Sequence, residues 1–551
     1  MELAETDVNK SARPVCRSYR AVGKVGVQLL SPLLFWASTA AAQITFQDLI
    51  KADSTNWYTY SGSYSGQRHS ALKQIDVGNV KNLAPKWVYH LVGNGQSEVV
   101  PVVADGVMYV SQANEVHALD ARTGRLVWKY QRAAPTGRNR GLAVAGYRVF
   151  LGTADAFLVA LDSRNGALVW ESKMPGSGVR YQGAAPLVLK DRVIVGTNSP
   201  SGGAVDAYDI ETGKPLWRWN AIPKPGEAGS ETWKDDSWKF GGGPTWLSGS
   251  YDPELNLIYW GTGQAGPDFD GDVRRGDNLY SDCMVAIDAS TGKLKWYFQF
   301  TPHDVHDWDA VEIPVLVDAQ YQGQPRKLLV QANRNGYYYV LDRTNGKFLH
   351  GTPFVKLLTW SKGLTADGHP MVIPGTEPTV QGNKVCPSTA GATNWPSPAY
   401  NPDTHFFYFI ATEGCGINYK ATENFQAGKF SGFVNSGTGY IESPEERESW
   451  QNYVRALDVT TGKLMWEYKQ IGSHHYGPGV LSTAGNLLFA GDLQGFLTAH
   501  DAKTGKPLWH FNTGDLITAS PMAYGAQGDE YVALVSGSNV FAFGLPDRPR
   551  P

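Results

Sequence analysis

The sequence predicts an all-β protein built from a repeated unit of four short strands, and three observations support this. The 551-residue chain contains 61 glycines and is 12% aromatic. Only 18% of its residues are charged, a balance typical of many short strands joined by tight turns. In addition, an eleven-residue phrase recurs, mostly at intervals of about 40–55 residues, which is the length of four strands with their turns.

Each copy of the phrase predicts two strands joined by a tight turn. In ALDARTGRLVW (118–128), the first strand ends at Asp120, Thr123-Gly124 forms the turn, and the second strand runs to Trp128. Glycine adopts the positive φ that such turns require, and the aspartate can accept hydrogen bonds from the turn's own amides. We expect the tryptophan to pack against the next unit. Further copies occupy residues 160–170, 207–217, 286–296, 456–466 and 499–509, and a seventh at 340–350 ends in histidine instead.

These copies predict a single eight-bladed β-propeller with tryptophan-docking repeats. Seven copies are present, and the long gap between Asp342 and Asp458 has room for one more blade. We assign that blade to SPAYNPDTHFFYFIAT (397–412). The segment from LAPKWVYHL (83–91) through PVVADGVMYVSQ (101–112) is expected to share in closing the ring. A tandem pair of smaller propellers is the alternative, although no linker-like stretch divides the chain.

The first 42 residues predict an export signal. Basic residues from Lys10 to Lys24 precede the apolar core VGVQLLSPLLFWAST (25–39), and small residues follow at 40–42. This core is shorter than the ~20 apolar residues of a membrane span, although a membrane anchor is the alternative. We therefore expect a signal peptide at 1–42 and a soluble periplasmic protein at 43–551, with no stable membrane anchor.

Charge and cysteine content narrow the function further. The net charge of −3 and the lack of a long basic run exclude a nucleic-acid partner. Cys16 leaves with the leader, and in an oxidising compartment Cys386 and Cys415 can form a disulfide. Cys283 lies in an apolar strand and is expected to be a buried free thiol. No C-x-x-C-H motif occurs, so this chain carries no covalent c-type haem.

One acidic stretch, TPHDVHDWDA (301–310), follows the predicted strand KLKWYFQF (293–300). Asp307 and Asp309 are two positions apart, so their side chains point the same way if the segment is extended. Two carboxylates on one face raise each other's pKa unless a cation lies between them. The pattern therefore favours a metal site over a solvated acidic turn. We expect His303 and His306 to be turn and packing residues.

Several segments match one known family in order and spacing. The chain resembles the pyrroloquinoline quinone (PQQ) dehydrogenases, the methanol and ethanol dehydrogenase family of eight-bladed quinoproteins. The resemblance extends over essentially all of residues 43–551. The matching segments are SGQRHSALKQIDVGNV (65–80), GRNRGLAVAGYRVFLGT (137–153), WKFGGGPTWLSGSYDPELNLIYWGTG (238–263), RRGDNLYSDCMVAIDASTGKLKW (274–296), TPHDVHDWD (301–309) and ANRNGYYYVLDRTNG (332–346).

The resemblance implies a reaction and a metal site. Asp307 would be the catalytic base, taking the hydroxyl proton of an alcohol or related substrate, or acting on an aldehyde, while hydride passes to PQQ. Asp307, Asp309 and Gln264 would bind one Ca²⁺ or lanthanide ion. A second aspartate at position 309 resembles the lanthanide-using branch of the family. Electrons would pass to a separate soluble cytochrome c, and a homodimer is left open.

The resemblance also implies residues that hold PQQ. Trp246 would form the floor on which the flat cofactor lies, and Arg334 would hydrogen-bond the quinone oxygens and Asp307. Arg140, Glu98 and Asn394 would bind other parts of the cofactor.

Two departures from the family pattern, the missing adjacent cysteines and the missing glutamate, support an alternative, a degenerate propeller that serves as a non-catalytic scaffold. The adjacent cysteines before N-R-G are replaced by residues 135–138, and the G-G-x-E metal-ligand segment by GTNSPSGGAVDAYD (196–209). The tryptophan expected before G-V-L is also absent, with Tyr476 nearby.

Overall fold

The computed structural model describes residues 43–51, 53–91, 97–134, 137–176, 178–179, 181, 183–420, 440–441, 449–472 and 477–547. The chain divides into the units Met1–Ala40 and Ala41–Pro551, and the described residues lie in the second. The expected signal peptide, Cys16 and Tyr476 lie outside the described residues.

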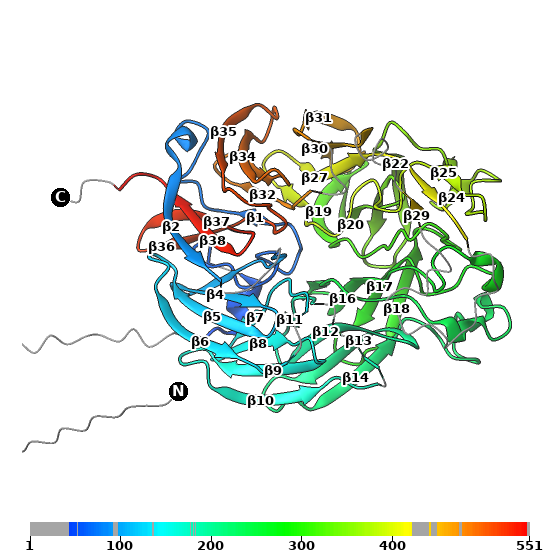
Figure 1. The fold of residues 1–551 in the computed structure, drawn as a ribbon, viewed down its shortest axis with the longest axis horizontal. Helices are drawn as coiled ribbons and strands as arrows, with labels where there is room; N and C mark the ends of the chain where they lie inside the picture. Colours follow the sequence, from blue (N-terminus) through cyan, green and yellow to red (C-terminus); the bar gives the residue numbers. More distant parts are fainter. Residues whose placement is uncertain are drawn as a thin grey trace, which may run out of the picture. The chain divides into compact units, whose positions relative to one another are not determined.

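Within the second unit, eight antiparallel blades of four strands form a ring, as Figure 1 shows. The predicted eight-bladed propeller is therefore confirmed, and a tandem pair of smaller propellers is not formed. In chain order the blades are β3–β6 (Val102–Ala104, Val107–Gln112, Glu115–Asp120, Leu126–Gln131), β7–β10 (Ala143–Ala145, Arg148–Gly152, Phe157–Asp162, Leu168–Lys173), β11–β14 (Leu187–Val188, Arg192–Ser199, Gly202–Asp209, Pro215–Asn220), β15–β18 (Ser250–Asp252, Leu257–Gly261, Cys283–Asp288, Leu294–Gln299), β19–β22 (Val315–Tyr321, Gln324–Ala332, Tyr337–Asp342, Phe348–Pro353), β26, β27, β30 and β31 (Ala399–Asn401, Phe406–Glu413, Gln451–Asp458, Leu464–Lys469), β32–β35 (Val480–Thr483, Leu487–Gly491, Phe496–Asp501, Pro507–Asn512), and β36–β38 (Met522–Ala526, Asp529–Ser536, Asn539–Gly544) with β2 (Ala84–His90).

The ring is closed by pairing the two ends of the propeller. Strand β2 runs antiparallel to β38, with Ala84 opposite Gly544 and His90 opposite Asn539. The expected role of the N-terminal segment is thus confirmed. A short additional strand, β1 (His69–Ser70), pairs in parallel with β32.

The assignment of an extra blade to residues 397–412 was wrong, although the total of eight was right. Strands β26 and β27 belong to the same sheet as β30 and β31, which carry the repeat copy at 456–466. The blade without a copy is β36–β38 with β2. Because its outer strand comes from the other end of the chain, it has no outer hairpin and needs no turn motif.

Neighbouring blades are joined by the repeated tryptophan, as predicted. Trp128 Nε1 donates a hydrogen bond to the carbonyl oxygen of Ser163, in the turn of the next blade, at 2.9 Å. The ring lies against the turn glycine of that blade: a Cβ on Gly166, where φ is +75°, would meet Trp128 at 2.5 Å. In the copy without tryptophan, the hydroxyl of Tyr338 donates to the carbonyl oxygen of Val459 at 2.8 Å.

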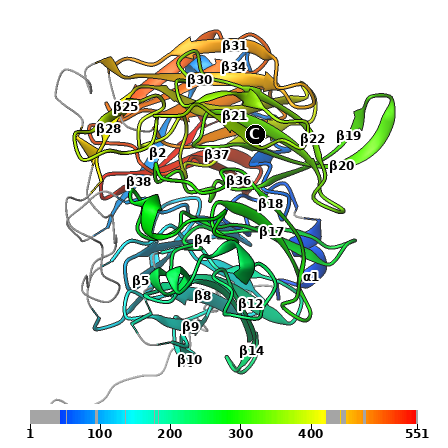
Figure 2. The same cartoon turned by 90° about the vertical axis from the view of Figure 1, so that its right-hand side faces the viewer.

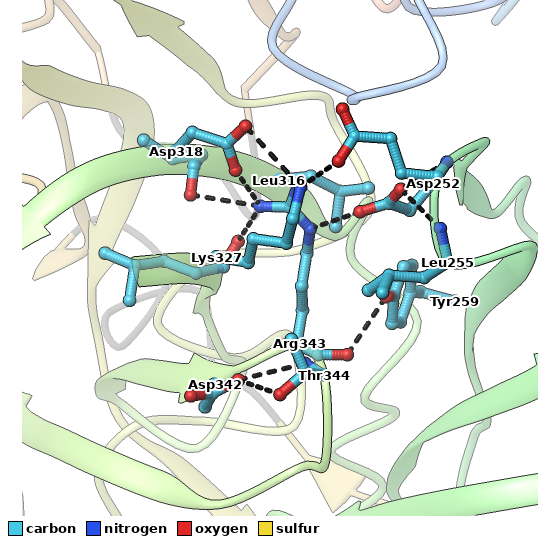
Figure 3. A network of polar contacts seen from close by, with 12 residues as sticks. Asp252, Leu255, Tyr259, Leu316, Asp318, Lys327, Asp342, Arg343 and Thr344 are labelled. Carbon is cyan, nitrogen blue, oxygen red and sulfur yellow. Dashed lines mark hydrogen bonds and ion pairs between the residues drawn. The ribbon is translucent and has the colours of Figure 1, made fainter. Parts of the chain in front are cut away.

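A buried arginine connects the two blades on either side of the acidic stretch (Figure 3). Arg343 Nε donates to Asp252 Oδ2 at 2.8 Å, and its Nη1 pairs with Asp318 Oδ1 at 2.6 Å. Its carbonyl oxygen accepts a hydrogen bond from the hydroxyl of Tyr259 at 3.0 Å. These contacts fix blade β15–β18 against blade β19–β22, and residues 300–314 run between these two blades.

The long gap between repeats holds small sheets outside the ring of blades. They are built from β23 (Ser361–Leu364), β24 (Pro370–Val372), β25 (Asn383–Val385), β28 (Gly416–Asn418) and β29 (Tyr440–Ile441). Figure 2 shows the ring turned by 90°, with the β19–β20 hairpin projecting from one side. Among the elements that lie wholly within the described residues, the helical ones are α1 (Phe46–Ile50) and four 3₁₀ turns, η1 (Val80–Asn82), η2 (Ser230–Thr232), η3 (Ser237–Phe240) and η4 (Gly271–Val273).

The cysteine predictions are confirmed. Cys386 and Cys415 form a disulfide beside β25 and β28, and Cys283 is a free, buried thiol in β17. Among the helices of the described residues, none combines the length and apolarity that a membrane crossing needs.

Candidate active site

Six of the residues predicted to hold cofactor or substrate line one cavity of about 490 Å³. They come from five blades but occupy similar places, in segments that lead into the first strand of a blade or join its inner strands. The hub of the ring gathers these segments, because the first strand of each blade is its innermost. The six are Glu98, Arg140, Trp246, Asp307, Arg334 and Asn394.

The acidic stretch brings two carboxylates to Arg334. Arg334 Nη1 lies 3.3 Å from Asp309 Oδ2, and Nη2 lies 3.9 Å from Asp307 Oδ2. The side chain of Asp307 is 25% exposed, whereas that of Asp309 is 8% exposed. The expectation of an extended segment was wrong, since Asp307 has φ of +62°. The two side chains reach the same guanidinium through this turn rather than through strand periodicity.

Asp309 is fixed by two N–H donors and one ion pair. Its Oδ1 accepts a hydrogen bond from the backbone N–H of Gln264 at 2.8 Å, and its Oδ2 accepts one from Trp246 Nε1 at 2.9 Å. The ion pair is with Arg334. The chain must have glycine at position 263, because a Cβ on Gly263 would lie 1.9 Å from Asp309 Oδ1. Asp309 is therefore held behind the cavity wall, with its orientation determined by neighbours in the next blade.

Arg334 is also held from the opposite side, by the segment that follows the disulfide. Its Nη2 donates to the carbonyl oxygen of Thr389 at 2.6 Å, and its own carbonyl oxygen accepts from the N–H of Ala392 at 2.9 Å. Asn394 Nδ2 donates to the carbonyl oxygen of Ala390 at 2.7 Å, which closes a turn in the same segment. This segment presents Asn394 and Trp395 to the cavity.

A second arginine forms part of the cavity floor. Arg140 lies over the ring of Trp246 at 4.7 Å and over that of Trp395 at 4.9 Å, measured from Cζ to the ring centroid. Its Nη2 pairs with Glu98 Oε2 at 2.7 Å. The cation–π contacts and the ion pair hold a planar cation between two indoles.

Burial dominates the electrostatics of the site. It raises the pKa of both Asp307 and Asp309, while the guanidinium of Arg334 opposes the rise. The pKa of Arg334 is raised, because the surrounding carboxylates outweigh the effect of its burial. Arg334 thus stays protonated, and it contacts Asp309 as well as Asp307, the one aspartate with which sequence reasoning paired it.

The remaining polar residues of the acidic stretch are structural. Asp304 accepts hydrogen bonds from the backbone N–H groups of His306 at 3.2 Å and Trp308 at 3.0 Å, which shapes the turn. The ring of His306 packs against Trp308 and contacts the Asn418 side-chain amide at 3.0 Å. His303 donates from Nδ1 to the carbonyl oxygen of Gly276. Both histidines occupy turn and packing positions, as expected.

Comparison with family models and curated proteins identifies the family. A family model described as "Glucose/ethanol/alcohol dehydrogenase, beta-propeller domain" matches residues 57–357, and one described as "Outer membrane protein assembly factor BamB" matches residues 451–542. The chain is 37% identical to the quinoprotein alcohol dehydrogenase PedH of Pseudomonas putida, over 93% of this chain and 91% of that protein. The chain belongs to the quinoprotein alcohol dehydrogenase family.

Other members of this family show the same extent of similarity. A lanthanide-dependent methanol dehydrogenase of Methylorubrum extorquens is 34% identical over 86% of this chain and 85% of that protein. Among solved structures, the quinohemoprotein alcohol dehydrogenase ADHIIG of Pseudomonas putida has a TM-score of 0.86 at 31% identity, covering 93% of this chain and 85% of that one. A europium-containing methanol dehydrogenase has a TM-score of 0.81 at 29% identity, covering 91% of this chain and all of that one.

The residues present fit the groups that quinoprotein alcohol dehydrogenases use. A floor of indole and two fixed guanidinium groups suits a flat, anionic quinone. Asp307 and Asp309 offer carboxylate oxygens, and the Oε1 of Gln264 is buried with no hydrogen-bond donor among the described residues. Such oxygens suit a hard cation. No three His, Cys, Asp or Glu side chains already surround one point in the part of the chain that the structure describes.

Sequence reasoning missed two further acids beside this site, Asp268 and Asp282. Gln264 Nε2 donates to Asp268 Oδ1 at 3.0 Å. Burial raises the pKa of Asp268 to about 7, and the charge of Asp309 adds to the rise. Burial likewise raises the pKa of Asp282 well above its usual range. The sequence signal was present as a group of acids directly after GTGQ, in GPDFDGD (266–272).

Proposed function

We propose that this protein is a periplasmic PQQ-dependent dehydrogenase that oxidises an alcohol or related hydroxyl or aldehyde substrate. Electrons would leave to a separate, soluble cytochrome c. One observation carries the proposal. At the hub of the propeller, one fixed arginine contacts two acids, of which Asp307 faces the cavity and Asp309 lies behind its wall.

The difference in exposure between Asp307 and Asp309 suggests that the two aspartates have different roles. Asp307 is the proposed catalytic base, since a substrate in the cavity can reach its carboxylate. Asp309, together with Asp307 and the side-chain oxygen of Gln264, is proposed to bind one Ca²⁺ or lanthanide ion. Support for a lanthanide comes from the similarity to the lanthanide-dependent methanol dehydrogenase.

The cofactor residues are proposed from their position around the cavity. Trp246 supplies a flat apolar surface, and Arg140, paired with Glu98, supplies a cation at the edge of that surface. Arg334 supplies N–H donors beside Asp307, and Asn394 supplies an amide at the rim. We propose that residues 43–551 form the secreted enzyme after removal of residues 1–42.

The chain's own residues prepare the proton transfer. Asp307 accepts the hydroxyl proton at Oδ2, and a general base of this kind typically contributes 10²–10⁴-fold to the rate. Arg334 holds Asp307 and Asp309 in fixed positions and compensates their charge, while the rings of Trp246 and Trp395 supply apolar surface in an otherwise largely polar cavity. When bound, PQQ supplies the hydride acceptor and the metal ion supplies a Lewis acid beside it.

The test is reconstitution of the purified protein. An enzyme will change the absorbance spectrum of added PQQ in the presence of Ca²⁺ or a lanthanide, and will reduce a dye when an alcohol is added. The alternative, a non-catalytic scaffold, is favoured by the lost glutamate segment at 196–209. That alternative predicts no spectral change and no dye reduction with either metal, and such a result would exclude the proposed enzyme.

A further inference from the structure

The proposed cation site has too few protein ligands. Ca²⁺ takes six to eight oxygen ligands, and lanthanide ions have similar demands with a higher charge. Here the proposed ligands are two carboxylates, Asp307 and Asp309, and the amide oxygen of Gln264. The glutamate that the family's G-G-x-E segment supplies is missing from residues 196–209. A working site needs another anionic oxygen.

Asp268 lies next to two of these ligands. Gln264 uses its side chain to reach Asp268, with Nε2 3.0 Å from Oδ1, and its backbone N–H to reach Asp309, at 2.8 Å from Oδ1. One residue therefore connects the two carboxylates. Asp268 is 2% exposed, and its Oδ2 receives no hydrogen bond from any described residue.

The same region contains other buried oxygens without donors. Gln264 Oε1 and both carboxylate oxygens of Asp282 have no hydrogen-bond partner among the described residues. The backbone N–H of Asp282 donates to the carbonyl oxygen of Gly263 at 2.9 Å, which places Asp282 beside Gln264 in the chain's fold. Burying a polar oxygen without a partner costs about 1–3 kcal/mol, and more for a charged one. A region rich in buried acceptors and poor in donors is suited to a cation.

The guanidinium of Arg274 is the cation nearby, and its charge opposes the rise in pKa that burial causes at Asp268 and Asp282. It donates to the carbonyl oxygens of Pro267 at 2.9 Å and Asp268 at 3.2 Å, and to the side-chain oxygen of Asn278 at 2.9 Å. Within the described residues it makes no ion pair with a carboxylate oxygen. Arg274 therefore fixes the backbone of the loop around Asp268 without pairing with the Asp268 side chain.

We propose that Asp268 is a fourth protein ligand of the cation and replaces the missing glutamate. This inference rests on the proposed function, since it completes the metal site of that enzyme. Binding would turn the Oε1 of Gln264 to the ion, release Asp268 from Nε2, and draw the carboxylates together. With Asp307 and Asp309, Asp268 provides three negative charges. That number balances a trivalent ion, so the site favours a lanthanide over Ca²⁺.

Terbium luminescence tests this proposal without PQQ and without turnover. Trp246 Nε1 is hydrogen-bonded to Asp309, so an indole lies beside any ion bound there and can transfer excitation energy to Tb³⁺. Tb³⁺ is titrated into the full-length mature protein and into Asp268→Asn, Asp268→Glu and Asp270→Asn variants. Asp270 is the matched control, because it is also buried, lies two residues away in the same loop, and makes no hydrogen bond with Gln264 in the described part of the chain.

We expect wild type and Asp270→Asn to bind Tb³⁺ within about twofold of each other. Asp268→Asn should bind at least about tenfold more weakly, since even losing a partner of a metal ligand typically costs 10–100-fold. Asp268→Glu keeps the charge and should restore binding to within a few-fold of wild type. Circular dichroism and melting of each variant show that the protein is folded.

The outcomes separate this inference from the proposed function. If wild type binds Tb³⁺ and Asp268→Asn binds it equally well, Asp268 is not a ligand, while the dehydrogenase proposal stands. If Asp270→Asn weakens binding as much as Asp268→Asn, the effect is one of general charge and the ligand role is overturned. If wild type gives no sensitised luminescence, both the ligand role and the lanthanide part of the proposed function fail.

Discussion

Replacing Arg334 with alanine should destabilise the protein strongly even in the absence of cofactor. The guanidinium is 7% exposed and serves two carboxylates, at 3.3 Å from Asp309 and 3.9 Å from Asp307, as well as the carbonyl oxygen of Thr389 at 2.6 Å. Removing one partner of a buried ion pair typically costs about 3–5 kcal/mol. Because Asp307 is 25% exposed and Asp309 keeps two other donors, we expect the lower end, about 3 kcal/mol.

The measurement is urea unfolding of the apoprotein, followed by tryptophan fluorescence. Arg326→Ala is the matched control, since Arg326 lies in β20 of the same blade and pairs with Asp342, but is 44% exposed. Such exposed pairs contribute up to about 1 kcal/mol. Arg334→Lys should fall between the two, because an ammonium keeps the charge but loses the fork that reaches three acceptors. An Arg334→Ala variant no less stable than Arg326→Ala would refute the view that Arg334 holds the site together.

Three other predictions concern parts of the molecule outside the cavity. Burial raises the pKa of Glu530 to about 7 from its usual 4.5, so between these pH values the folded protein keeps a proton that the unfolded chain has released. The stability that this group contributes is present at low pH and is lost as the pH rises through 7, by at most about 1.4 kcal/mol per pH unit. Glu530→Gln should abolish this contribution to the pH dependence of the unfolding free energy, measured by urea unfolding between pH 5 and 7. Replacing Cys386 and Cys415 with serine should cost about 3 kcal/mol and lower the urea midpoint, and an unchanged midpoint would show that the disulfide does not stabilise the fold. N-terminal sequencing of the exported protein should begin near Gln43, whereas an intact Met1 on membrane-bound material would contradict the signal peptide.

The blades could be predicted from sequence because the turn motif is local. The aspartate, the glycine with positive φ and, in six of the seven copies, the docking tryptophan lie within eleven residues. In the copy at 118–128, for example, Asp120 Oδ1 accepts hydrogen bonds from the N–H groups of Arg122 at 3.0 Å and Thr123 at 2.9 Å. The family resemblance also predicted which residues gather at the hub, since six of the predicted residues line one cavity.

The sequence predictions were wrong where the structure depends on contacts between residues that lie far apart in the sequence. The eighth blade requires β2 and β38 to pair from opposite ends of the propeller, and no local motif marks that pairing. Asp307 adopts a left-handed backbone conformation that a non-glycine residue seldom takes, so an extended segment was the natural expectation. Asp268 lies in a visible group of acids, GPDFDGD (266–272), but its importance, like that of Asp282, depends on the burial of carboxylate oxygens that have no donor, which is a property of the folded state.

Asp307 is proposed to act as the base and Asp309 as a metal ligand, and metal titration of variants at these two positions tests this difference most directly. Asp307→Ala loses the base as well as one proposed metal oxygen, so PQQ-dependent dye reduction with an alcohol should fall by about 10² or more and stay low even at saturating metal. Asp309→Ala should bind metal more weakly, and excess metal should restore part of its activity, more readily with Ca²⁺ than with a lanthanide. Gln264→Ala should shift metal binding in the same direction by a smaller amount, because a neutral oxygen is lost. If Asp309→Ala has the metal affinity of wild type, the paired carboxylates are not a metal site and the account is contradicted.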